Sequence, residues 1–403
     1  MLRKKFTQVR KYADLHRVTP ISTVSEAAFH DSLQSNRLLS RLREAYLAQR
    51  FKVQNEDPSE EINSLHSLPM TVLPRENIFA QVNKDAKIGH WRKPAVKWFR
   101  LGLYMLKYYK DGVKNTYILA KRTKPLLQNY NATNCLVSEL FKKVEFNEIE
   151  HRLMKKSSND TIKPLPLSRR QFIECHRRKE VWKIPTFFLL ALMFEELTAV
   201  ICYVWPKVAP HNCLTPGGFK KISGAHANEQ LDKLKKVPPY ASPYMLSEDE
   251  VFAKLRSLAI EETPYWKLKL YRFMDNKSIP QEALVKAHQF LFVDDWLLLQ
   301  HILHEPTTKL TVAELVDCIW LRQLYYRHED INVMANNTEG RRVLVWRLLI
   351  YWAFRFDKTV SCGGDKLFAE RWGVNNIALL NYSGKGGGSL VGRDELSILE
   401  SSQ

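Results

Sequence analysis

The sequence lacks several patterns that would place a protein in a well-defined class. Its six cysteines show no C-x-x-C pair or other short spacing, which excludes the usual zinc sites and disulfide frameworks. No D-x-D-x-D-G loop indicates an EF-hand calcium site, and no G-x-S-x-G elbow indicates a nucleophile. GKGGGS at 384–389 lacks the spacing of a phosphate-binding loop. We therefore expect no enzyme, no cofactor and no bound metal.

Long stretches of alternating apolar and polar residues are also missing, so the pattern gives no support for a sheet. Helical periodicity is common instead, and Ser168, Ser247 with Glu250, and Thr311 with Glu314 have the residue types that cap helix starts. His301, His304 and Glu305 could imitate a metal site, but without a matching acidic ligand a helix surface is the better interpretation. The sequence predicts an all-α protein.

Charge is strongly one-sided. Lys and Arg number 61 against 43 Asp and Glu, a net charge of +18, which favours contact with polyanions such as ribosomal RNA or anionic lipid head groups. The first residues, MLRKKFTQVRKYA, are basic and amphipathic, with no acid before Asp14 and no continuous apolar run of a secretory signal. This is typical of a mitochondrial targeting peptide, although an ordinary basic surface helix has the same pattern.

One apolar stretch is long enough to cross a bilayer. Residues 184–206 are flanked by basic and aromatic residues, as at two membrane interfaces, but Glu195 and Glu196 lie at the centre. Between residues 186 and 205, ten Leu, Ile, Phe and Val residues favour insertion by about 3 to 6 kcal/mol, and two central carboxylates oppose it by about 5 to 7 kcal/mol. We interpret the stretch as a transmembrane helix whose acids are protonated, partnered or turned inward. A buried helix of a soluble bundle is the alternative.

These features divide the chain into seven parts. They are a targeting peptide and N-terminal helix at 1–50, a linker at 51–90, an N-terminal helical region at 91–183, the transmembrane helix at 184–206, a connection at 207–243, a helical domain at 244–360 and a C-terminal tail at 361–403.

The order of short motifs resembles the LETM family, the leucine-zipper and EF-hand transmembrane proteins of the mitochondrial inner membrane. The resemblance runs from about Trp91 to Phe356. It rests on YYKDGVK (108–114), LSRRQ (167–171), the span with Ile184, Pro185, Glu195, Trp205 and Pro206, LSEDEVFAKL (246–255), Asp294 with Asp295, LTVAELVDCIWLR (310–322) and the helix RLLIYWAF. Gln171 stands where that family has Glu, the prolines usual inside the span are missing, and there is no EF-hand or long C-terminal coiled coil.

The resemblance implies a single inner-membrane span and a helical, 14-3-3-like domain of the LETM ribosome-binding type in the matrix. It implies a protein that binds mitochondrial ribosomes at the membrane and supports translation or assembly of respiratory-chain subunits. The alternative is a cation/proton antiporter, for K⁺ or Ca²⁺, that controls matrix ion content and volume. The missing prolines in the span favour the first role over transport.

Two sets of residues would carry these roles. Glu195 and Glu196 are the ion-relay candidates of the antiporter. Arg322, Arg341, Arg342 and Arg347 are the ribosome-binding candidates, with a solvated helix face as the simpler alternative. The expected partners are the mitochondrial ribosome, through rRNA or ribosomal proteins, and inner-membrane lipids, with a homo-oligomer left open and no DNA. A soluble RNA-binding helical protein is a third interpretation.

Overall fold

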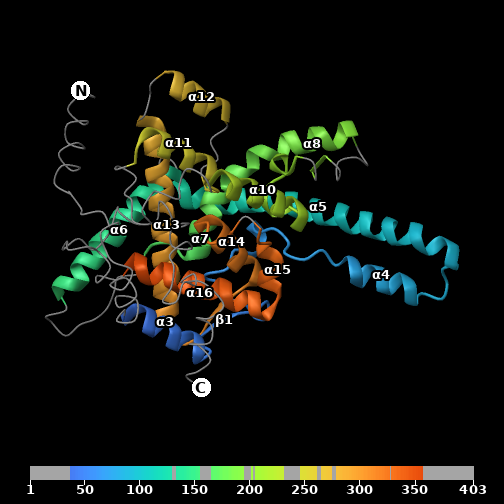
Figure 1. The fold of residues 1–403 in the computed structure, drawn as a ribbon, viewed down its shortest axis with the longest axis horizontal. Coiled ribbons are helices and arrows are strands. Elements are labelled where there is room, and N and C mark those ends of the chain that lie inside the picture. Colours follow the sequence, from blue (N-terminus) through green and yellow to red (C-terminus); the bar gives the residue numbers. More distant parts are fainter. Residues whose placement is uncertain are drawn as a thin grey trace.

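The protein is described here by a computed structural model, in which residues 37–128, 133–154, 165–194, 201–202, 205–230, 246–260, 265–274, 278–326 and 328–356 are placed. The expectation of a mostly helical protein is confirmed (Figure 1). Within these ranges the β-structure is one parallel pair of three-residue strands.

Three helices form the centre of the core, namely α13 (Ser278–His304), α14 (Val312–Arg322) and α16 (Thr338–Phe356). Each is buried on most of its surface, as expected for helices that are apolar all round. In α16 every residue from 344 to 353 is buried. The longest of the three is α13, a single helix of 27 residues. Around these three lie α6 (Thr133–Met154), which packs along α13, and α3 (Arg37–Leu47), α10 (Pro216–Gln230), α11 (Glu248–Ser257), α12 (Tyr265–Phe273) and α15 (Ile331–Asn336).

A short parallel sheet joins the N-terminal part of the described chain to this core. Strand β1 (Phe51–Val53) pairs with β2 (Thr308–Leu310), with Phe51 opposite Thr308. The Phe51 ring also lies 6.4 Å from the ring of Trp352 in α16. The stretch 51–90, for which the sequence predicts a linker, contributes a strand and buried side chains to the core.

The longest helix is α5 (Lys93–Gln128), with 36 residues and hence a length of about 54 Å. Its C-terminal half packs against α7 (Arg169–Arg177) in the body of the protein. Its N-terminal part extends away from the body, and α4 (Arg75–Lys84) folds back along it (Figure 1). We call α4 together with residues 93–106 of α5 the arm.

The middle of α5 is fixed by the short 3₁₀ turn η7 (His211–Cys213). A Cβ on Gly112 would lie 2.5 Å from the Sγ of Cys213, so only glycine permits this approach. The Asn212 side chain donates to the carbonyl of Gly112 and accepts from the hydroxyl of Thr116. Tyr108 donates its hydroxyl to the carbonyls of residues 212 and 214. The arm therefore begins where a dense set of polar contacts ends.

The predicted transmembrane helix over 184–206 is corrected by the structure. Among the placed residues, no helix has both the length and the apolar character that crossing a bilayer requires. Helix α8 comprises Lys183–Phe194. The Phe187 ring lies 5.8 Å from the Tyr109 ring, and both residues pack in a small buried cluster that includes Cys202.

Candidate functional site

The densest group of chemically active side chains is a buried ionic network that begins at helix α7. Ser168 caps this helix as predicted, because its hydroxyl accepts from the backbone N–H of Gln171 and the Gln171 side chain accepts from the Ser168 N–H. The capped start fixes Arg169 at the first helical position. Arg169 donates to Oδ1 of Asp294 at 2.7 Å and to Oε2 of Glu314 at 2.9 Å.

Two adjacent acids of α13 form the middle of the network. Asp294 accepts from Arg169 on one oxygen and from Arg322 of α14 on the other. Asp295 accepts from Arg322 at 2.7 Å and forms an ion pair with Arg355 of α16 at 3.2 Å. The two acids thereby join α7, α13, α14 and α16.

Aromatic donors of α16 complete the shell around Asp295. The Tyr351 hydroxyl donates to its Oδ2 at 3.0 Å and the Trp352 indole N–H donates to its Oδ1 at 2.8 Å. Arg355 also donates to the Tyr351 oxygen at 2.6 Å. Both oxygens of Asp295 are therefore occupied by donors from the core.

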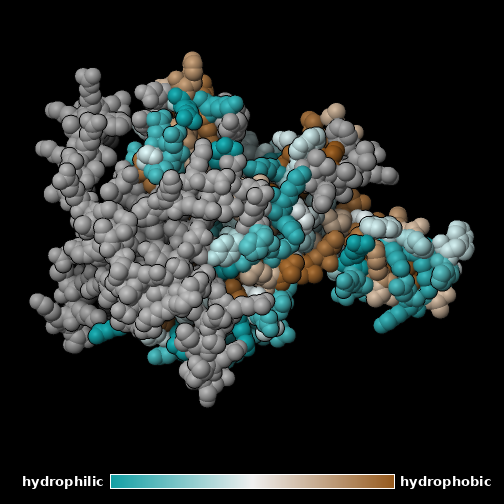
Figure 2. All heavy atoms as spheres, viewed as in Figure 1, coloured by the Kyte–Doolittle hydropathy of each residue, from teal (hydrophilic) through white to brown (hydrophobic). Residues whose placement is uncertain are grey.

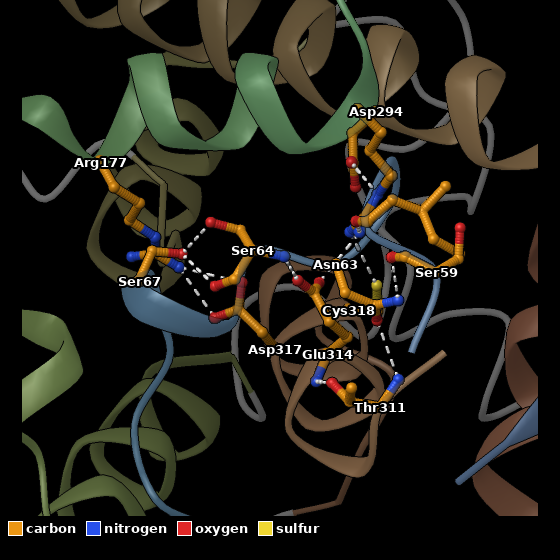
Figure 3. A network of polar contacts seen from close by, with 12 residues as sticks. Ser59, Asn63, Ser64, Ser67, Arg177, Asp294, Thr311, Glu314, Asp317 and Cys318 are labelled. Atoms are coloured by element: carbon orange, nitrogen blue, oxygen red, sulfur yellow. Dashed lines mark hydrogen bonds and ion pairs between the residues drawn. The ribbon is translucent and has the colours of Figure 1, made fainter. Parts of the chain in front are cut away.

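The segment between β1 and α4 closes the network from the N-terminal side, as Figure 3 shows for Asn63, Ser64, Thr311 and Glu314. The Thr311 hydroxyl accepts from the Glu314 N–H, so the predicted cap of α14 forms. The Glu314 carboxylate, however, accepts from the backbone N–H of Ser64 and from Arg169 instead of returning to Thr311. Asn63 accepts from the Thr311 N–H at 2.9 Å. Residues some 250 positions apart are thus joined by buried polar contacts.

A second branch lies beside the first. Arg177, near the end of α7, contacts both oxygens of Asp317 at 2.8 and 3.0 Å, and His211 of η7 contacts the same carboxylate at 3.1 Å. The His211 ring stacks on Trp320 with centroids 5.1 Å apart. This branch connects the ionic network to η7, which holds the middle of α5.

Burial decides what this network can do. The six charged side chains of the first branch are at most 2 % exposed, and three guanidinium groups balance three carboxylates. Burial opposes ionisation, but Arg169 and Arg322 hold the pKa of Asp294 below its usual value. Burial likewise opposes ionisation of Asp317, yet Arg177 and His211 keep its pKa well below the usual range. Burial and the charge of Arg177 lower the pKa of His211, which favours the neutral ring at pH 7.

These acids are poorly suited to catalysis. A general acid or base must reach a proton of the substrate within hydrogen-bond distance, and each of these carboxylates already accepts from at least two buried donors. Removing one partner would leave an uncompensated buried charge. In the part of the chain that is placed, no group of three His, Cys, Asp or Glu side chains could hold a metal ion. The arrangement is suited to joining helices.

The predicted site residues fall into three groups. Glu195 and Glu196 lie outside the described residues. Arg322 is fully buried in the network, and Arg347 is 4 % exposed and forms an ion pair with Glu329 at 2.6 Å, so neither side chain lies on a surface that could meet RNA. Arg341 donates to the carbonyls of Ala335 and Val53. Burial raises the pKa of Tyr46, and the positive charges of Arg342 and Arg341 oppose this shift in part.

The sequence interpretation missed the roles of Arg169, Glu314 and Asp317. A signal was present, because LSRRQ, the Asp294–Asp295 pair and LTVAELVDCIWLR all place charged residues within otherwise apolar helical patterns. A charge inside such a pattern predicts a buried partner. The pattern does not say which partner, and the structure brings these three motifs together.

The fold and site define a class: a helical protein with a closed ionic core and an extended arm. A sequence model of the pentamidine resistance factor domain matches residues 62–303. The mitochondrial pentamidine resistance factor of Saccharomyces cerevisiae is 38 % identical to this chain over 348 residues, which cover 80 % of this chain and 81 % of the yeast protein. This protein belongs to the pentamidine resistance factor family. No solved structure matches it.

The family membership corrects two earlier predictions. The resemblance to the LETM family is wrong, and so are the roles inferred from it, ribosome binding at the membrane and cation/proton exchange. Three of the motifs that suggested it, LSRRQ, the Asp294–Asp295 pair and LTVAELVDCIWLR, are helix starts and buried charges, features that many helical cores need. The mitochondrial location predicted from the N-terminus is confirmed by the mitochondrial relative.

Proposed function

We propose that this protein is a non-enzymatic factor of the mitochondrial inner membrane that contributes to resistance against pentamidine. The closed ionic network is the observation that carries the non-enzymatic part of the proposal. The charged groups with the strongest interactions are paired with one another at 0 to 2 % exposure, where they stabilise the packing of four helices. A catalytic centre needs at least one such group directed toward a substrate.

The drug-resistance part comes from the yeast relative, whose name states it of that protein. The part of this chain that matches the family model, residues 62–303, includes the arm and the η7 junction. A net charge of +18 is compatible with a location at an anionic membrane surface.

The proposal is tested in a yeast strain that lacks the relative. Expression of this chain is expected to restore growth on pentamidine to that of the parental strain, with an empty vector as the control. The protein should fractionate with inner-membrane vesicles after the mitochondria are ruptured. Normal accumulation in mitochondria without any gain in growth would refute the resistance role, and recovery in the matrix supernatant alone would refute the membrane location.

A further inference from the structure

Apolar side chains lie exposed along one side of α5 in the arm. Phe99, Leu103 and Leu106 are 67, 50 and 58 % exposed. At 100° per residue they lie within about 60° of each other around the helix, so they form one continuous face. In α4, Val82 is the single buried residue, so little of this helix packs against the rest of the protein. Such a surface is costly in water unless another phase or partner covers it.

Helix α8 carries a second exposed apolar face. Phe188, Leu189, Leu192 and Met193 are 56 to 67 % exposed and follow one another around about 140° of the helix. Lys183, its first residue, is its one charged residue. The opposite side is anchored, because Phe187 packs on Tyr109 of α5. Figure 1 shows α8 and the arm extending from the same side of the body, and Figure 2 shows apolar residues along α5 between the body and the arm.

Positive charge accompanies these faces. Helix α5 has seven Lys and two Arg against a single acid, Asp111. Lys107, Lys110 and Lys114 are exposed immediately after the apolar face, and Trp91 and Trp98 are 77 and 59 % exposed near the start of α5. Long basic side chains can reach lipid phosphates while apolar groups enter the acyl boundary, and Trp prefers that boundary.

We propose that the arm and α8 form a docking surface for a bilayer that contains anionic phospholipids. Phe99, Leu103 and Leu106 enter the interface between head groups and acyl chains, and the Lys side chains contact phosphates. The residue composition of this surface favours a bilayer over a protein partner. Protein interfaces are also rich in aromatic residues, but they contain few Lys residues. The inference rests on the proposed inner-membrane location and names the part of the protein that makes the contact.

The test uses the full chain and two triple variants with equal loss of apolar residues. The arm variant is Phe99→Gln, Leu103→Gln and Leu106→Gln. The control variant is Leu270→Gln, Phe273→Gln and Met274→Gln, which removes three apolar residues of similar exposure at the end of α12. Gln is a good helix former, and circular dichroism verifies that both variants keep the helical content of the parent.

Binding is measured by sedimentation with vesicles of phosphatidylcholine, with or without one-third of an anionic phospholipid. The parent chain and the control variant are expected to bind the anionic vesicles, and the arm variant to bind at least about tenfold more weakly. Binding of the parent should also weaken with added salt or without the anionic lipid.

Three results would overturn the inference. The first is that the arm variant binds as tightly as the parent, and the second is that both variants lose binding equally. The third comes from inner membranes whose proteins have been removed by protease: if the parent binds untreated membranes but not the treated ones, its partner is a protein. If the protein fractionates with the inner membrane while the arm variant stays bound, the docking surface is wrong and the proposed location stands. If it never fractionates there, the location itself fails.

Discussion

At the scale of single residues, the protein stabilises its core with charges that are fully enclosed. A buried ion pair contributes little net stability by itself, because desolvation offsets the attraction, but removal of one partner is costly. Asp295 is the acid with the most varied partners, since it meets two arginines, a Tyr hydroxyl and a Trp N–H. It therefore gives the clearest single-residue test of the network.

We expect Asp295→Asn to lower the free energy of unfolding by about 3 to 5 kcal/mol, because Arg322 and Arg355 lose their shared counter-charge in the core. The measurement is urea unfolding followed by circular dichroism. The matched control is Asp249→Asn, which removes an ion pair with Arg272 of similar length at an exposed site and should change stability by less than about 1 kcal/mol. Equal effects of the two substitutions would contradict the role of burial.

Lys254 gives a pH-dependent test at the same scale. Burial lowers its pKa from the ordinary value to about 7, and its Nζ donates to Oε1 of Gln323. Between pH 7 and about 10.4 the unfolded chain holds a proton on this amine that the folded chain has lost, so the cost of burying the amine shrinks as pH rises. Urea unfolding of Lys254→Met should therefore show its largest advantage over the parent near pH 7 and a smaller one at pH 10. A difference that does not change with pH would contradict the lowered pKa.

At the scale of elements, helix starts are the part of the structure that the sequence predicts best. Ser168 and Thr311 accept the N–H groups expected of them, and Ser247 donates its N–H to Glu250. These signals are local, so no knowledge of the fold is needed. The partners of Glu314 could not be predicted in this way, because one of them is a backbone N–H at Ser64, which any residue would supply.

Residues 184–206 illustrate a second limit at this scale. Hydropathy reports that a side chain avoids water but not whether lipid or protein receives it. Phe187 meets Tyr109 while the next residue, Phe188, is 61 % exposed. One apolar stretch therefore serves both packing and surface exposure, and a window average cannot separate the two.

Two glycines of α5 provide a matched test of the η7 junction. At Gly112 a Cβ would meet the Sγ of Cys213 at 2.5 Å, whereas at Gly102 nothing lies within 4 Å. Gly112→Ala should destabilise the protein by about 1 to 3 kcal/mol through overpacking, even though Ala favours helix. Gly102→Ala should raise stability by up to about 1 kcal/mol. Thermal unfolding of both variants makes the comparison, and a stabilising Gly112→Ala would contradict the close contact.

At the scale of the whole molecule, segments distant in the sequence depend on each other. β1 pairs with β2 across more than 250 positions, Phe51 packs on Trp352, and the backbone of residues 62–64 contacts Arg169 and Glu314. From the sequence, residues 51–90 resemble a linker, because a three-residue strand is too short to show alternation and backbone contacts do not depend on side-chain composition. The role of residues 51–64 in the core becomes evident only from their contacts with residues far along the chain.

This dependence predicts the outcome of two truncations. A chain that begins at Arg37 keeps every contact described here and should unfold cooperatively with the midpoint of the full chain. A chain that begins at Trp91 loses β1, the carbonyl of Ile62 and the N–H of Ser64, which leaves β2 unpaired and deprives Arg169 and Glu314 of one buried hydrogen-bond partner each. We expect it to show a broad thermal transition and to expose apolar surface to a fluorescent dye. A sharp transition of the Trp91 chain at the parental midpoint would show instead that residues 37–90 are dispensable to the core.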